Sequence, residues 1–423
     1  MSSAKKIGLF ACTGVVAGNM MGSGIALLPA NLASIGGIAI WGWVISIIGA
    51  MSLAYVYARL ATKNPQQGGP IAYAGEISPA FGFQTGVLYY HANWIGNLAI
   101  GITAVSYLST FFPILNNPVP AGIACIAIVW IFTFVNMLGG TWVSRLTTIG
   151  LVLVLIPVVM TAVVGWHWFD VATYQANWNT SSTTDSHAVI KSILLCLWAF
   201  VGVESAAVST GMVKNPKRTV PLATMLGTAM AASGAPFAIS ASTILGGWAA
   251  PMVSAFTAFA CLTSLGSWMM LVGQAGVRAA NDGNFPKVYG EVDNNGIPKK
   301  GLLLAAVKMT ALMVLITLMN SAGGKASDLF GELTGIAVLL TMLPYFYSCV
   351  DLIRFEGINI RNFVSLICSV LGCVFCFIAL MGASSFELAG TFIVSLIILM
   401  FYGRKMHQRQ NNASDNNTTA NAH

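Results

Sequence analysis

Long apolar stretches separated by short polar connections make up almost the whole chain. A hydrocarbon core of about 30 Å needs about 20 helical residues at 1.5 Å each. By this measure the sequence predicts an all-α polytopic membrane protein of about 12 transmembrane helices, near residues 7 to 30, 38 to 58, 84 to 112, 120 to 137, 147 to 168, 190 to 212, 220 to 245, 251 to 279, 301 to 320, 329 to 353, 363 to 381 and 386 to 402. The connections leave no room for a separate soluble domain, so residues 1–423 form one transmembrane domain, and the polar tail 403–423 is predicted to be disordered.

Composition supports the membrane reading. Of all residues, 56% are hydrophobic and only 8% are charged, which is too little polar surface for a water-soluble fold of this size. The formal charge of +7 comes from Lys and Arg gathered at alternate connections, such as Lys5 and Lys6, Lys214 to Arg218, and Arg404. Basic connections face the cytoplasm, so both termini are predicted to be cytoplasmic, and no nucleic-acid surface is expected.

Two predicted spans are interrupted near their centres. The first carries Gly22, Ser23 and Gly24 within "GNMMGSGIALLP", and the sixth carries Gly202 and Glu204 within "LWAFVGVESAAVSTG". Interrupted helices five spans apart are typical of transporters with a 5+5 inverted repeat, here repeat 1 about 7–168 and repeat 2 about 190–353, with two extra spans at 363–402. The alternative for the first break is close helix packing, because Gly14, Gly18 and Gly22 have GxxxG spacing.

Glu204 is the clearest candidate for function. A carboxylate in mid-membrane costs about 2.5–3.5 kcal/mol on insertion scales, and no Lys or Arg lies in the interior of the same span to neutralise it. The alternative is a protonated side chain that donates to a carbonyl of a neighbouring helix.

Other chemistry finds little support in the sequence. All eight cysteines lie inside predicted spans, and the CxxC pair Cys373 and Cys376 has no second pair or nearby His, so no metal and no cofactor is predicted. The spans contain no HExxH motif, no paired Asp and no Ser/His set, so the chain is not predicted to be an enzyme.

The motifs resemble a known family. "GNMMGSGIALLP", "GGPIAYAGE", "LYYHANWIGN", "LWAFVGVESAAVSTGMVKNPKRTVP" and "GSWMMLVGQAGVRAANDGNFPKVY" are similar to the amino acid/polyamine/organocation superfamily, basic amino acid/polyamine antiporter branch. The resemblance implies that Gly22, Ser23 and Gly24 receive an amino acid carboxylate and that Ile25 begins the second half-helix. It also implies that Trp198 is a gate over the substrate and that Glu204 is a pH-sensitive acid behind this gate. By the same resemblance, Tyr89 and Asn97 line the site and Trp268 closes it.

Cationic substrates fit the remaining aromatic and acidic residues. An ammonium group gains about 0.5–2 kcal/mol from an aromatic face. Tyr73 and Tyr90 offer such faces beside those already named, and Glu76 and Asp282 near the cytoplasmic ends are candidates for substrate recruitment. The alternative for each of these aromatic residues is ordinary packing in the core. The alternative for the two acids is a solvated position in a loop.

The implied activity is exchange of external lysine for internal cadaverine in acid resistance, with proton-coupled cadaverine uptake at neutral pH. The expected partners are lysine, cadaverine, protons and the lipid bilayer of the bacterial inner membrane, with a functional link to lysine decarboxylase. The oligomeric state stays open, a homodimer included. Two alternatives remain. One is an exchanger for putrescine/ornithine or agmatine/arginine. The other, from a different class, is a channel for organic cations, but the sequence contains no ring of charges and no filter motif that would indicate a channel.

The sequence departs from the family pattern at the seventh span. After Ala229 the chain lacks about twenty residues, roughly the length of one span. Either segment 220–245 rebuilds a span from other residues, or the chain is a truncated member that has lost any aromatic ligand on the missing piece.

Overall fold

The computed structural model describes residues 6–22, 28, 32–164, 167, 169–233, 249–321 and 335–420. Within these ranges the chain is helical with short connections, and its only β-type pairing is an isolated bridge between Ile7 and Val213. Eight helical segments of this part are long and apolar enough to cross a membrane, and the helices Leu9–Met20 and Gly140–Ile156 are shorter apolar ones. The all-α membrane fold predicted from the sequence is confirmed.

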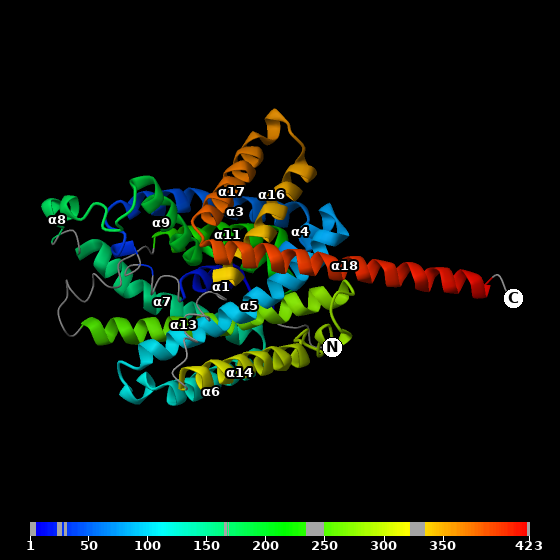
Figure 1. Cartoon of the computed structure of the whole chain (residues 1–423), viewed down its shortest axis with the longest axis horizontal. Helices are drawn as coiled ribbons and strands as arrows, with labels where there is room; N and C mark the ends of the chain where they lie inside the picture. Colours follow the sequence, from blue (N-terminus) through cyan, green and yellow to red (C-terminus); the bar gives the residue numbers. More distant parts are fainter. Residues whose placement is uncertain are drawn as a thin grey trace.

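Each predicted span contains a helix (Figure 1). In chain order these are α1 (Leu9–Met20), α3 (Ala39–Lys63), α5 (Pro79–Leu108), α6 (Pro118–Met137), α7 (Gly140–Val164), α9 (Asp185–Phe200) with α10 (Ser205–Val208), α11 (Pro216–Ser233), α13 (Ala249–Asn281), α14 (Lys299–Ser321), α16 (Met342–Glu356), α17 (Phe363–Met381) and α18 (Ser385–Ala420). Two short helices lie in connections: α4 (Pro70–Ile77) and α8 (Val171–Ala176). Residues 234–245 of the predicted seventh span lie outside the described residues.

The tail differs from the prediction. α18 continues to Ala420 and projects away from the body of the molecule, as the red helix in Figure 1 shows. An existing helix extends at little cost, because nucleation is its expensive step, so even a polar, Asn-rich sequence continues the turns of the apolar segment before it. The structure describes residues 403–420 as helix, where the sequence predicted a disordered tail over 403–423.

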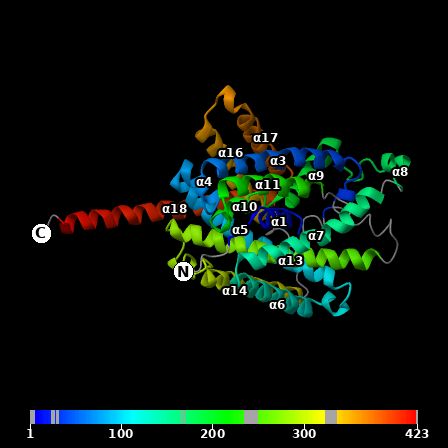
Figure 2. The same ribbon diagram turned by 180° about the vertical axis from the view of Figure 1, so that it is seen from behind.

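The broken helices lie inside the bundle. α1 packs against α7, α11 and α13, and α13 packs against α5 and α7 (Figure 2). Small residues allow these contacts. A Cβ on Gly14 would clash with Thr148 Oγ1, and one on Gly22 would clash with Ser264 Oγ. Packing therefore explains part of the glycine pattern in α1, beside the interruption itself.

Candidate functional site

The two predicted interruptions lie next to each other. α1 ends at Met20, and residues 21 and 22 form a turn. α9 ends at Phe200, and Gly202 has φ +112°, a conformation that glycine adopts without strain. Asn19 Nδ2 of α1 donates to Ser205 Oγ of α10 at 2.8 Å, which joins the two breaks directly. Discontinuity of both helices, predicted from the sequence, is confirmed.

Glu204 occupies the second break, at the residue that precedes α10. Its side chain is fully buried. Tyr89 OH of α5 donates to Oε1, and Tyr345 OH of α16 donates to Oε2, both at 2.6 Å. Within the described part of the chain no Lys or Arg forms an ion pair with it. Two hydroxyl donors on the two oxygens match a carboxylate, whereas a proton donated to a helix carbonyl, the alternative from the sequence, has no counterpart here.

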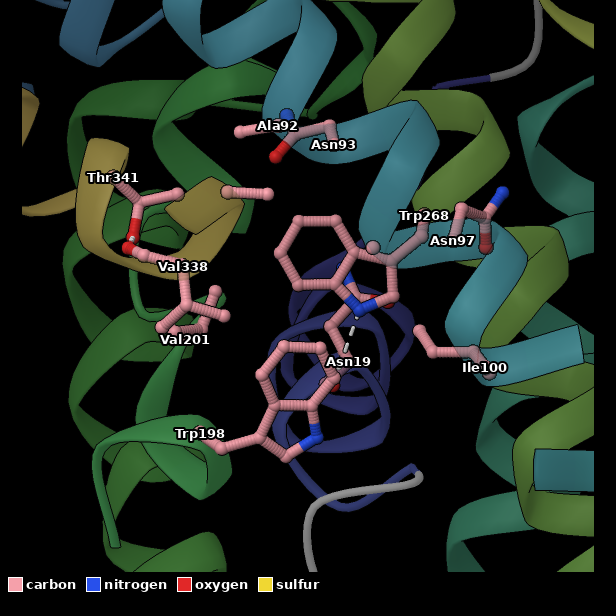
Figure 3. A pocket seen from close by; sticks show the side chains of 12 residues that line it. Asn19, Ala92, Asn93, Asn97, Ile100, Trp198, Val201, Trp268, Val338 and Thr341 are labelled. Carbon is pink, nitrogen blue, oxygen red and sulfur yellow. Dashed lines mark hydrogen bonds between the residues drawn. The ribbon is translucent and has the colours of Figure 1, made fainter. Parts of the chain in front are cut away.

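A cavity lies beside the two breaks. It has a volume of about 40 Å³ and combines amide, aromatic and aliphatic side chains. Figure 3 shows Trp198 and Trp268 extending into its centre, with Ala92 and Asn93 on one side and Val338 and Thr341 on another. Trp268 Nε1 donates to the Asn19 carbonyl at 3.2 Å, so the indole from α13 is fixed against the end of α1.

Amides in the cavity wall leave polar atoms unpaired. Both side-chain atoms of Asn97 and Oδ1 of Asn19 are buried and have no hydrogen-bond partner among the described residues. Buried polar groups in proteins are normally satisfied, so unpaired amides beside a cavity suit a polar ligand. The cavity therefore combines unpaired amide groups with two indole rings.

The structure brings together only part of the predicted site. Asn97, Trp198 and Trp268 line the cavity. Tyr89 and Glu204 do not line it and are joined to each other by a hydrogen bond. Ser23, Gly24 and Ile25 lie outside the described residues, and Gly22 packs on Ser264 of α13.

Tyr73 and Tyr90 lie away from the cavity wall. Tyr73 of α4 is fully buried, and its ring centroid is 6.3 Å from that of Tyr57, which in turn contacts Tyr345 at 5.9 Å. Tyr73 therefore belongs to a row of tyrosines that leads toward Glu204. Tyr90 faces a different side of α5 from the one that carries Tyr89, and its ring packs against Phe285 and Tyr289.

Glu76 and Asp282 are both paired with arginine. Arg354 reaches Glu76 at 3.3 Å, and Arg278 reaches Asp282 at 2.8 Å. Both acids line a surface pocket of about 380 Å³, which also includes Arg278 and Tyr402. Their recruitment role stays a prediction, and any cation there would compete with two guanidinium groups.

Sequence reasoning missed three residues of the site. Asn19 lies within the quoted "GNMMGSG" motif, and Asn93 lies one turn before Asn97, so an i, i+4 amide pair on the third span was a readable signal. Tyr345 had no such signal, since it is one aromatic among many in an apolar span, and only the fold brings it to Glu204.

Comparison with known proteins identifies a family. Residues 7–234 match the family model described as amino acid permease. The chain is 89% identical to the cadaverine/lysine antiporter of Escherichia coli, with all of both chains covered. It is 30% identical to the putrescine transporter PotE of Escherichia coli over 95% of this chain and 97% of that one. That alignment with the cadaverine/lysine antiporter has 444 positions, 21 more than the 423 residues here, so at least that many positions lack a counterpart in this chain.

Solved structures support the fold. A manganese transporter from Eremococcus coleocola superposes with a TM-score of 0.57 at 14% identity, covering 93% of this chain and 92% of the other. Such low identity shows the architecture alone. The family match and the two curated relatives show that this chain is a membrane protein that belongs to the amino acid permease family.

Proposed function

We propose that the protein exchanges external lysine for internal cadaverine across the bacterial inner membrane. The observation that carries the proposal is the buried Glu204 carboxylate, held by two tyrosine hydroxyls beside an aromatic and amide-lined cavity. An anion that has no basic partner among the described residues, next to such a cavity, suits an organic cation. The cadaverine/lysine antiporter that is 89% identical supports the same substrate pair.

The residues divide the work by chemistry. The backbone of Gly22, Ser23, Gly24 and Ile25 receives the carboxylate of lysine, because unwound helix ends expose N–H groups. Trp198 and Trp268 cover the methylene chain, with Asn97 at its polar end. Glu204 acts as the titratable group through Tyr89, whereas Tyr73, Tyr90, Glu76 and Asp282 support the path from the cytoplasm.

Charge movement limits the exchange. Lysine enters with charge +1 and cadaverine leaves with +2, so one net positive charge moves outward against an inside-negative potential, at a cost of about 2.3 kcal/mol per 100 mV. A steep outward gradient of cadaverine must offset this cost. A lysine decarboxylase inside the cell would supply that gradient and consume a proton per cycle, which links the transporter to acid resistance. At neutral pH the same site would take up cadaverine together with a proton.

Substrate competition tests the choice of diamine. In proteoliposomes with the purified protein, uptake of labelled cadaverine is expected to be inhibited more strongly by lysine than by ornithine or arginine. The 30% identity to a putrescine transporter makes ornithine/putrescine the second candidate pair. Stronger inhibition by ornithine would therefore replace lysine and cadaverine with that pair.

Trans-stimulation separates an exchanger from a channel. Unlabelled cadaverine inside the vesicles is expected to accelerate entry of labelled cadaverine, because an exchanger returns faster when loaded. Protein-free vesicles and vesicles with unlabelled sucrose inside serve as controls. Equal entry rates with and without internal cadaverine would indicate a pore.

The topology makes a separate prediction. Both termini are proposed to face the cytoplasm, and α11 to cross toward the outside in a single transmembrane domain formed by two repeats and two further spans. A cysteine tag inserted after Ser233 is expected to react with a membrane-impermeant maleimide added to intact cells, in a variant that lacks the native cysteines. A tag after Lys214 is the matched cytoplasmic control. Protection of the Ser233 tag until the cells are lysed would contradict this topology.

A further inference from the structure

A lysine side chain lies within the membrane part of α14. Lys308 follows Lys300 by eight residues, which places its Cα about 12 Å along the axis from the cytoplasmic end of the helix. Its neighbours Ala305, Ala306 and Met309 are fully buried. A positive charge at this depth is costly unless it has a partner, and such residues mark function by default.

Carboxylates do not provide that partner. Among the described residues the ion pairs involve Arg59, Arg278, Lys299, Lys300 and Arg354, and none involves Lys308. The neighbouring His91 donates from Nδ1 to the Val87 carbonyl at 2.9 Å.

Aromatic rings provide it instead. Lys308 Nζ lies 4.8 Å from the centroid of the Tyr90 ring and 5.2 Å from that of Tyr289. Phe285 contacts both rings edge-on or tilted, with centroids 5.0 and 5.3 Å away. Tyr90 is 1% exposed and Tyr289 9% exposed, so both ring faces are largely screened from water. Tyr90 and Tyr289 therefore form an aromatic cage for the ammonium, with Phe285 packed against both rings, and aromatic cages bind alkylammonium groups.

We propose that Lys308 is a resident ammonium ligand of this aromatic cage and that Tyr90 acts on transport as a positioning residue, through Lys308. Adjacent residues on a helix point about 100° apart, so Tyr89 contacts Glu204 while Tyr90 faces the cage. The ammonium contact fixes α14 and the segment Lys287–Tyr289 to α5. In this way it sets the orientation of the helix that carries Tyr89, Asn93 and Asn97. The consequence for transport rests on the proposed function, but the cage itself does not.

Chemical rescue tests the cage without transport. Lys308→Ala is expected to lower the Tm of the purified protein and to leave an empty cage, and n-butylammonium chloride is expected to restore that loss. Lys308→Met fills the space without a charge and is the matched control, in which butylammonium gives only the shift seen in the parent. The double variant Tyr90→Leu/Lys308→Ala is expected to show no extra shift either. Equal shifts in Lys308→Ala, Lys308→Met and the parent would overturn the proposal.

A double-mutant cycle tests the positioning role. Tyr90→Leu and Lys308→Met are each expected to raise the KM for cadaverine by about 3- to 30-fold, the range that corresponds to a cation–π contact. Because both remove the same contact, the double variant is expected to match the single variants, and Lys308→Arg to retain most of the affinity. If the rise in KM of the double variant equals the product of the rises in the two single variants, Tyr90 contacts the substrate itself. That result would overturn the positioning role.

Discussion

Replacing Glu204 with Gln is expected to slow cadaverine exchange about 100-fold and to remove its dependence on pH. Gln has the same size, but it carries no charge and does not titrate. It also has one acceptor oxygen for two tyrosine donors, Tyr89 and Tyr345, so one hydroxyl must turn to accept from the new amide. A hydrogen bond to a charged group contributes about 1.5–3 kcal/mol, and 1.36 kcal/mol corresponds to a factor of ten, which gives this magnitude.

Counterflow of labelled cadaverine between pH 5 and 8 measures both effects. The matched control is Glu291→Gln, because Glu291 is half exposed in a connection and pairs with Lys300. This control is expected to exchange at the rate of the parent, since exposed ion pairs contribute little. If the Glu204 variant keeps the rate and pH profile of the parent, the carboxylate has no part in transport.

Gly202→Ala is expected to give the second largest effect. At φ +112° a side chain strains the backbone by about 1–3 kcal/mol. The new methyl group would also lie 3.1 Å from Trp268 Cζ2 and 3.3 Å from Asn19 Cβ, two residues of the cavity wall. The break would have to shift against both, so we expect a lower Tm and at least a tenfold higher KM for cadaverine.

Gly296→Ala separates strain from crowding. Gly296 also has positive φ, +77°, but a Cβ there meets nothing within 4 Å. This control is expected to lose stability without a change in KM. Equal KM values for the parent and the Gly202 variant would show that the second break does not need its close contact with the cavity.

Much of the fold follows from spacing alone. The recurrence of apolar stretches the length of a bilayer predicts the helices, and glycines beside an isolated acid predict the interruption at Val201 to Glu204. These features are local, so a single sequence reveals them. The end of α18 was missed because polar composition suggests disorder, whereas a helix that is already formed continues through it.

Contacts between distant spans could not be predicted from the sequence. Tyr345 lies 141 positions from Glu204, and no pattern in the tenth span marks it as a donor. Tyr89 and Tyr90 were both predicted to offer aromatic faces to the substrate, yet the helix turns them to different partners. The environment of Lys308 was not predicted, because its partners are neutral rings on α5 and in a connection, and a neutral ring has no opposite charge that marks it as a partner.

The bridge at Ile7 bears on how the transporter moves. Ile7 N donates to the Met212 carbonyl, and Lys214 N donates to the Ile7 carbonyl, both at 2.9 Å. These two backbone hydrogen bonds connect the start of α1 to the segment that follows α10. We therefore expect the start of α1 and the segment after α10 to move together when the transporter changes conformation.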